Sequence, residues 1–191
     1  MKTSITKEEL GQLPQREFDG HPVTVINEEQ AEIAVRQIRE AQCVVGFDTE
    51  TRPSFHKGET HKVALVQLSI DKVCFLFRLN KIGGIPSCLK MLLEDQEVIK
   101  IGLSTKDDFR NLNKWEELSP KGFVELQELV TKFGITDKSL AKIYAIIFEK
   151  RISKRQQLTN WEADQLSHQQ QAYASLDAIA CVEIYRKLIN C

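Results

Sequence analysis

Apolar residues in the first half of the chain fall into short, nearly continuous runs, which are typical of strands buried inside a sheet. Five strands are expected from these runs, at residues 23–26, 44–50, 63–70, 73–79 and 98–103. Only Asp71 and Lys72 separate the third run from the fourth, so these two strands are predicted to form a tight antiparallel hairpin.

Helical spacing of apolar residues occupies much of the remainder. Helices are expected at about residues 28–41, 86–95 and 107–116, and everything beyond residue 122 is predicted to be helical, ending in a long helix from about Glu162 to Leu188. A brief helix is also expected after Thr6, because Thr6 and Glu9 have the spacing of a capping box.

The order of these elements indicates the fold class. Strands interleaved with helices and followed by a helical tail predict an α/β fold with mixed strand directions. The order hairpin, helix, strand, helix is compatible with a ribonuclease-H-like core, in which a mixed five-stranded sheet is flanked by helices. The polar residues 1–20 are interpreted as an N-terminal arm, and residues 21–191 as one domain.

The composition is that of a globular domain, since 42% of the 191 residues are hydrophobic and 28% are charged. No apolar run approaches the roughly 20 residues that span a bilayer, and the first residues lack the apolar stretch of a secretory signal. A cytoplasmic protein with no membrane partner is therefore expected. The net charge of −1 argues against a protein that holds long duplexes by charge alone, but it does not exclude a protein that acts on nucleic acid.

Two carboxylates end the buried strand at 44–50. Side chains alternate along a strand, so Asp48 and Glu50 point the same way, opposite to Phe47 and Thr49. Neighbouring carboxylates repel each other, and a divalent cation such as Mg²⁺ resolves that conflict with oxygen ligands. The alternative is a strand that simply runs out into solvent.

A second acidic signal lies in the last helix. Tyr173 and Asp177 are four residues apart and share one face, which continues through the apolar residues Ala180, Cys181 and Ile184. An acidic side chain on a face that packs against a sheet needs a partner, and a metal ion is one candidate. The alternative is a buried hydrogen bond between Asp177 and Tyr173 in a structural helix.

A third signal lies where the strand at 98–103 leads into a helix. Ser104 and Asp107 have capping-box spacing, which gives Asp107 a structural role at the helix N-terminus. Asp108 is then left for another role, with Phe109 and Leu112 turned to the core. The alternative for Asp108 is a favourable interaction with the helix dipole.

Together these residues carry a resemblance to a known family. Their order along the chain is Asp48-Thr49-Glu50, Asp108 and Tyr173-x-x-x-Asp177. This order resembles the three exonuclease motifs of the DEDDy group of 3′→5′ exonucleases, which includes ribonuclease D and the exonuclease domain of the Werner syndrome helicase. The stretches VGFDTE at 45–50 and VALVQL at 63–68 add to the resemblance, which covers roughly residues 23–190.

The resemblance implies a function and its catalytic residues. Asp48, Glu50, Asp108 and Asp177 would hold two divalent metal ions, Mg²⁺ or Mn²⁺, and Tyr173 would position the attacking water. The substrate would be the single-stranded 3′ end of RNA or DNA, and the products nucleoside 5′-monophosphates. Two other functions stay open, namely a catalytically weak nucleic-acid-binding protein of the same fold and an endonuclease.

Residues 138–155 form a basic segment, with six basic side chains against one acidic side chain. The six are Lys138, Lys142, Lys150, Arg151, Lys154 and Arg155. The segment is interpreted as a basic loop that holds the phosphates of a bound strand through Lys154 and Arg155. The alternative is a solvated helix end. Trp161 is a further candidate contact that would stack on a base, although such a residue is more often a packing anchor.

Overall fold

The computed structural model describes residues 2–190, so Met1 and Cys191, the outer ends of the proposed arm and domain, lie outside the described residues. The strands are β1 (His21–Val25), β2 (Val45–Thr51), β3 (Val63–Ile70), β4 (Val73–Arg78), β5 (Lys100–Gly102) and β6 (Phe123–Glu125). The helices are α1 (Lys7–Gln12), α2 (Glu28–Glu40), α3 (Leu79–Ile82), α4 (Ser87–Leu93), α5 (Thr105–Leu112), α6 (Leu126–Lys132), α7 (Leu140–Phe148) and α8 (His168–Ile189).

The strands form one mixed sheet in the order β1-β4-β3-β2-β5-β6. The β3–β4 hairpin is antiparallel and turns at Asp71 and Lys72, as predicted. Strand β2 lies inside the sheet, antiparallel to β3 and parallel to β5. The α/β class and the mixed sheet are therefore confirmed.

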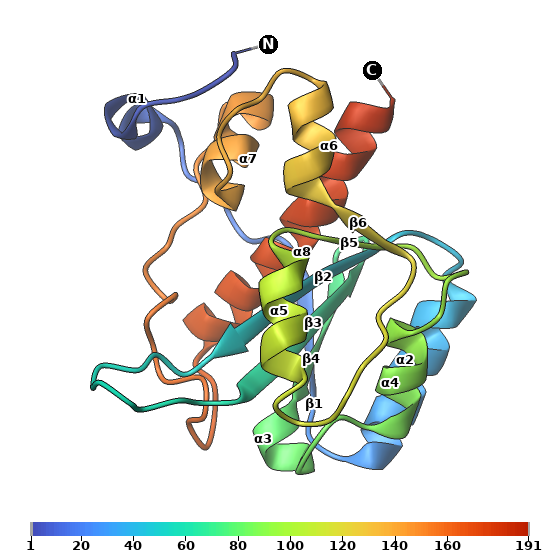
Figure 1. The fold of residues 1–191 in the computed structure, drawn as a ribbon. Coiled ribbons are helices and arrows are strands. Elements are labelled where there is room, and N and C mark those ends of the chain that lie inside the picture. Colours follow the sequence, from blue (N-terminus) through green and yellow to red (C-terminus); the bar gives the residue numbers. More distant parts are fainter. Residues whose placement is uncertain (1, 191) are drawn as a thin grey trace.

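Helices cover both faces of this sheet (Figure 1). Helices α2, α4 and α5 lie on one face, and the 22-residue helix α8 crosses the other face against β2, β3 and β4. Helices α6 and α7 pack against α8 and not against the centre of the sheet. No helix among residues 2–190 is both long enough and apolar enough to cross a membrane.

Three expectations about the second half of the chain are wrong. The sheet has six strands and not five, because residues 123–125 pair in parallel with β5 instead of continuing a helix. The last helix begins at His168 and not at Glu162, since Ser167 and Gln170 form a capping box there. The segment between α7 and α8 is irregular, so the region beyond residue 122 is not helical throughout.

Helix α8 approaches β2 closely at Gly46. A Cβ atom at this position would lie 2.0 Å from the backbone oxygen of Ala178 and 2.3 Å from the hydroxyl of Ser69. No side chain fits in that space, so Gly46 lets the helix pack directly on the strand that carries Asp48 and Glu50.

We expect Gly46→Ala to lower the free energy of unfolding by about 3 kcal/mol or more, because the methyl group would push α8 off the sheet. Gly11→Ala is the matched control. A Cβ atom at Gly11 meets nothing within 4 Å, and alanine in helix α1 should stabilise by about 0.5–1 kcal/mol. Thermal unfolding of both variants measures the difference, and equal melting temperatures would contradict the close packing.

Candidate active site

Three carboxylates converge where α8 crosses β2. Asp48 and Glu50 extend from β2 toward the face that α8 covers, while Phe47 packs into the core on the opposite face. Asp177 comes from α8. One oxygen of each carboxylate, from Asp48, Glu50 and Asp177, lies within 4.8 Å of the other two. The alternation along β2 and the position of Asp177 on the sheet-facing side of α8 thus produce the acidic cluster.

Asp108 reaches the end of β2 from the opposite face of the sheet. Its helix, α5, packs there through Phe109, whose ring lies 5.9 Å from that of Phe47. The hydroxyl of Thr49 donates a hydrogen bond to Asp108 Oδ1 at 2.5 Å. Asp108 is not part of the triad within 4.8 Å, but it is close enough for the charge of Asp48 to raise its pKa.

The expected capping of α5 by Ser104 is wrong. Ser104 lies in the left-handed region (φ 62°) and its side chain makes no capping hydrogen bond. The cap comes from Glu125 at the end of β6, whose carboxylate accepts hydrogen bonds from the backbone N–H groups of Ser104 (3.0 Å) and Thr105 (2.8 Å). Asp107 pairs with Arg110 in solvent. Sequence reasoning missed Glu125 because β6, the strand that carries it, was not identified.

Burial raises the pKa of every carboxyl in this group. Loss of hydration is the largest cause in each case. It raises the pKa of Asp48 to about 7 and that of Asp108 to about 8. The charges of the other three carboxylates add to burial in raising the pKa of Glu50 to about 10, and the pKa of Asp177 also rises well above its usual value. Without a cation, the cluster therefore retains protons at neutral pH.

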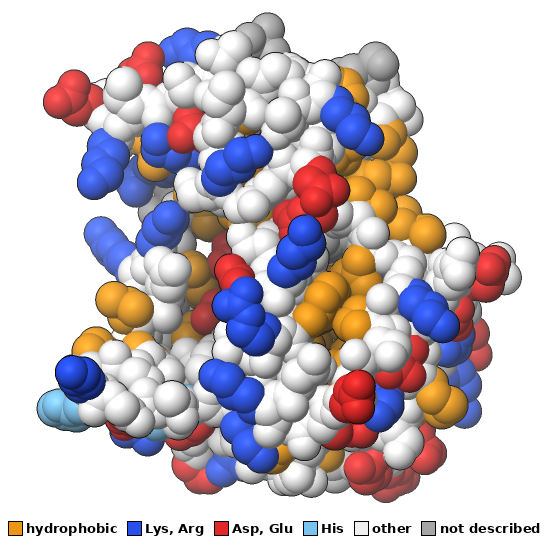
Figure 2. Space-filling view, in the orientation of Figure 1, with side chains coloured by type: hydrophobic (Ala, Val, Ile, Leu, Met, Phe, Trp, Pro, Cys, Tyr) orange, Lys and Arg blue, Asp and Glu red, His pale blue; other side chains and the backbone are white. Residues whose placement is uncertain are grey.

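The cluster lies at the floor of an open cavity of about 480 Å³. Figure 2 shows this hollow with acidic side chains deep inside it and Lys and Arg side chains around its rim. Two of the predicted basic residues, Lys138 and Lys154, line the cavity. The charge of Lys154 is close enough to lower the pKa of Asp177, although burial outweighs it.

Tyr173 lines the same cavity, one helical turn before Asp177. Burial, followed by the charge of Asp177, raises the pKa of the Tyr173 phenol, so the hydroxyl keeps its proton at neutral pH. A hydrogen bond from Tyr173 lowers the pKa of Asp177. Tyr173 and Asp177 therefore interact, as expected for a purely structural pair, but they do so at the wall of the cavity.

The other residues predicted to contact nucleic acid do not all lie at this cavity. Trp161 is fully buried, with its ring 6.1 Å from that of Tyr173, so the expectation that it stacks on a base is wrong and it is a packing anchor. The basic segment is not one loop, because the mostly buried helix α7 interrupts it. Arg155 lines a neighbouring cavity and not the one that holds the carboxylates.

The donor set fits divalent cations. Among residues 2–190, no ion pair joins a Lys, Arg or His side chain to Asp48, Glu50, Asp108 or Asp177. Carboxylate oxygens in an open site are the ligands that Mg²⁺ and Mn²⁺ prefer. These residues can therefore hold a cation that offsets their repulsion.

The raised pKa values give a test by pH. The ordinary pKa values are 3.8 for Asp and 4.5 for Glu, so between pH 5 and 8 the folded cluster binds protons that the unfolded chain has lost. Stability in a chelator should therefore fall as pH rises through this range. The stability of the Asp108→Asn variant should fall less, because the asparagine has no proton to lose. Mg²⁺ should restore more of the melting temperature at pH 8 than at pH 6. A chelated protein that becomes more stable over this range would contradict the shifts.

Solved structures with the same fold include an EXO domain and an exoribonuclease. The structure of the Aedes aegypti Nibbler EXO domain matches with a TM-score of 0.80 at 20% identity, covering 93% of this chain and 91% of that one. Escherichia coli RNase D matches with a TM-score of 0.78 at 20% identity, covering 89% of this chain and 44% of that one.

Sequence comparison extends this likeness. The chain is 32% identical to the bifunctional 3′-5′ exonuclease/ATP-dependent helicase WRN of Mus musculus over 152 residues, which is 77% of this chain and 11% of that protein. It is 36% identical to a 3′-5′ exonuclease of Arabidopsis thaliana over 150 residues, or 75% and 52% of the two lengths. The matches thus span about half or less of these relatives. The family profile described as 3′-5′ exonuclease matches residues 22–190, and the chain belongs to this family of hydrolases.

Proposed function

We propose that this chain removes nucleotides one at a time from the 3′ end of single-stranded RNA or DNA by metal-dependent hydrolysis. The observation that carries the proposal is the triad of carboxylates within 4.8 Å at the floor of an open cavity, with no cationic side chain paired to it among the described residues. In a member of the 3′-5′ exonuclease family, such a triad fits a site for phosphodiester hydrolysis.

The four carboxylates would hold the metal ions. The residues are Asp48, Glu50, Asp108 and Asp177. Two divalent ions, Mg²⁺ or Mn²⁺, supply a lowered pKa for the attacking water and charge neutralisation at the leaving oxygen when they are bound. The water would lose a proton to solvent as its oxygen bonds to phosphorus. The bond from phosphorus to the 3′ oxygen of the preceding nucleotide would break, and that oxygen would take a proton from solvent. The product is a nucleoside 5′-monophosphate.

Tyr173 would orient the water. Because its pKa is raised, the phenol remains an O–H group that donates and accepts hydrogen bonds and does not act as a base. Its partner Asp177 and the ring of Trp161 hold it in the wall of the cavity. A rigid hydrogen-bonding group beside the acidic cluster suits the placement of a nucleophile.

The rim suits a single strand. Lys154, which lines the cavity, would meet phosphates that approach the acidic floor. Beside the segment that carries Lys154, the apolar side chains of Phe55 and Leu158 are 73% and 69% exposed and line one hollow. Exposed apolar side chains beside a basic rim fit unstacked bases better than a paired duplex.

Product analysis tests the proposal. Single-stranded RNA and DNA labelled at the 5′ end are incubated with Mg²⁺, with Mn²⁺ and with excess chelator. Both polymers are tested because the relatives differ. One is a Trypanosoma brucei RNase D solved with RNA U12, and another is the exonuclease/helicase WRN. We expect labelled strands that shorten from the 3′ end, unlabelled mononucleotides detected by chromatography, and no activity in chelator. Internal fragments, binding without cleavage, or full activity in chelator would overturn it.

Two neighbouring aspartates provide a sharp prediction. We expect Asp108→Asn to abolish cleavage while the protein remains folded. Asp107→Asn should keep most activity and lose only a few tenths of a kcal/mol, because Asp107 makes only an exposed ion pair with Arg110. Cleavage rates and melting temperatures of both variants decide. An active Asp108 variant beside an inactive Asp107 variant would show that Asp107, and not Asp108, is the metal ligand.

The role of Tyr173 is tested by removing a single oxygen. We expect Tyr173→Phe to lower the turnover number by about 100-fold, because the ring still packs on Trp161 but nothing orients the water. The affinity for Mn²⁺ and the melting temperature should change little. An unchanged turnover number in a folded variant would make Tyr173 a structural residue.

A further inference from the structure

The N-terminal arm, residues 2–20, precedes the segment that matches the family profile. It nevertheless packs against the helical side of the domain, close to α7 (Figure 1). Ile5 is buried with side chains of α6, α7 and α8, and its backbone N–H donates to Asp137 at 2.8 Å. Helix α1 then begins at a capping box of Thr6 and Glu9. The arm is therefore part of the folded structure.

The end of the arm pairs with the segment that enters the site. The backbone N–H of Arg16 donates to the carbonyl of Arg151, and the N–H of Arg151 donates to the carbonyl of Pro14, both at 2.9 Å. The guanidinium of Arg151 donates to the carbonyl of Leu13 at 3.0 Å. Among the described residues, these are the backbone hydrogen bonds that join residues 150–153 to another part of the chain.

The residues that follow Arg151 form one wall of the active-site cavity. Ile152, Ser153 and Lys154 line it, and only Ile152 is buried in the core. On the other side of this wall, Ser153 and Tyr173 also line a second cavity of about 320 Å³ together with Arg16. The segment with Lys154 is thus a thin partition, held on one side by the arm.

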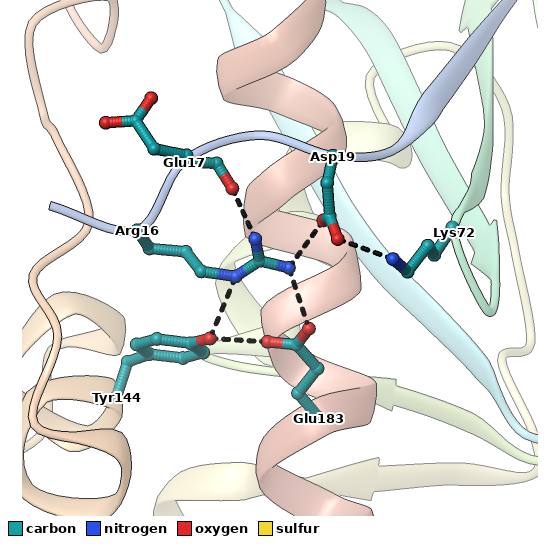
Figure 3. A network of polar contacts seen from close by, with 6 residues as sticks. All are labelled: Arg16, Glu17, Asp19, Lys72, Tyr144 and Glu183. Atoms are coloured by element: carbon teal, nitrogen blue, oxygen red, sulfur yellow. Dashed lines mark hydrogen bonds and ion pairs between the residues drawn. The ribbon is translucent and has the colours of Figure 1, made fainter.

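The side chain of Arg16 fixes the arm to two helices, as Figure 3 shows. Its guanidinium donates to the hydroxyl of Tyr144 on α7 at 3.2 Å and to Glu183 on α8 at 3.0 Å. It also pairs with Asp19 at 2.7 Å, and Asp19 in turn pairs with Lys72 in the hairpin turn. Arg16 is only 14% exposed, so these contacts are better shielded from solvent than the pair at Lys72, which is 68% exposed.

We propose that the arm positions the substrate-binding wall: Arg16 anchors residues 14–16, and these hold Arg151 so that Lys154 faces the phosphates of the bound strand. The inference rests on the proposed function. Ordering a free segment costs conformational entropy, so a wall that is ordered before binding increases affinity for the substrate. Arg16 is a positioning residue and contacts no substrate atom.

Arg16→Met tests this role, since methionine keeps the stem and loses the guanidinium. We expect the KM for a single-stranded oligonucleotide to rise about fivefold with kcat unchanged. Lys72→Met removes the other cation of the same network, which does not touch the wall, and should leave KM unchanged. In a Lys154→Met background, Arg16→Met should have little further effect, because the arm acts through Lys154. Equal effects in both backgrounds, or a fall in kcat alone, would overturn the proposal.

Hydrogen exchange provides a reading that does not depend on activity. The backbone amides of residues 151–157 should exchange faster in Arg16→Met than in the wild type, with α8 unchanged. Unchanged exchange in that segment would overturn the proposal even in an active enzyme, whereas an inactive wild type with the expected exchange would contradict only the proposed function. If Arg16→Met fails to fold, Glu183→Gln weakens the same anchor and replaces it in the test. The exchange rate of residues 151–157 should then increase by a smaller amount, and an unchanged rate would overturn the proposal.

Discussion

The main constraint on this structure is the electrostatic cost of holding four carboxyl groups together in a partly buried place. Each group loses hydration and faces the charges of its neighbours, so the ionised forms are unfavourable without a compensating cation. The folded chain then has two ways to relieve the repulsion, binding protons or binding divalent ions. A site that exchanges protons for cations at neutral pH suits the hydrolysis of a polyanion.

A rigid scaffold sustains this cost. Strand β2 lies inside the sheet and directs two carboxylates to one face, where α8 brings the third. The absence of a side chain at Gly46 allows that close approach. Helix α5 brings Asp108 from the other face, and Glu125 holds the first turn of that helix. The N-terminal arm lies outside the segment that matches the family profile. It adds to this scaffold because it holds the wall that carries Lys154.

Local patterns predicted much of this site from the sequence. Alternation in a buried strand placed Asp48 and Glu50 on one face, and helical spacing placed Tyr173 beside Asp177. The predictions that failed concern features that depend on contacts between residues far apart in the sequence. The three-residue strand β6 has no periodicity to detect, and Glu125 caps α5 from 20 residues away, displacing the local cap expected of Ser104. The burial of Trp161 likewise follows from how the irregular segment before α8 folds onto the sheet, which no single stretch of sequence records.

The acidic cluster is expected to exchange protons for divalent cations. Titration calorimetry with Mn²⁺ at pH 6.5, in two buffers of different protonation enthalpy, measures both the binding and the protons it releases. We predict saturable binding with net proton release that shrinks as the pH is raised. Binding without proton release, or no binding at millimolar Mn²⁺, would contradict it.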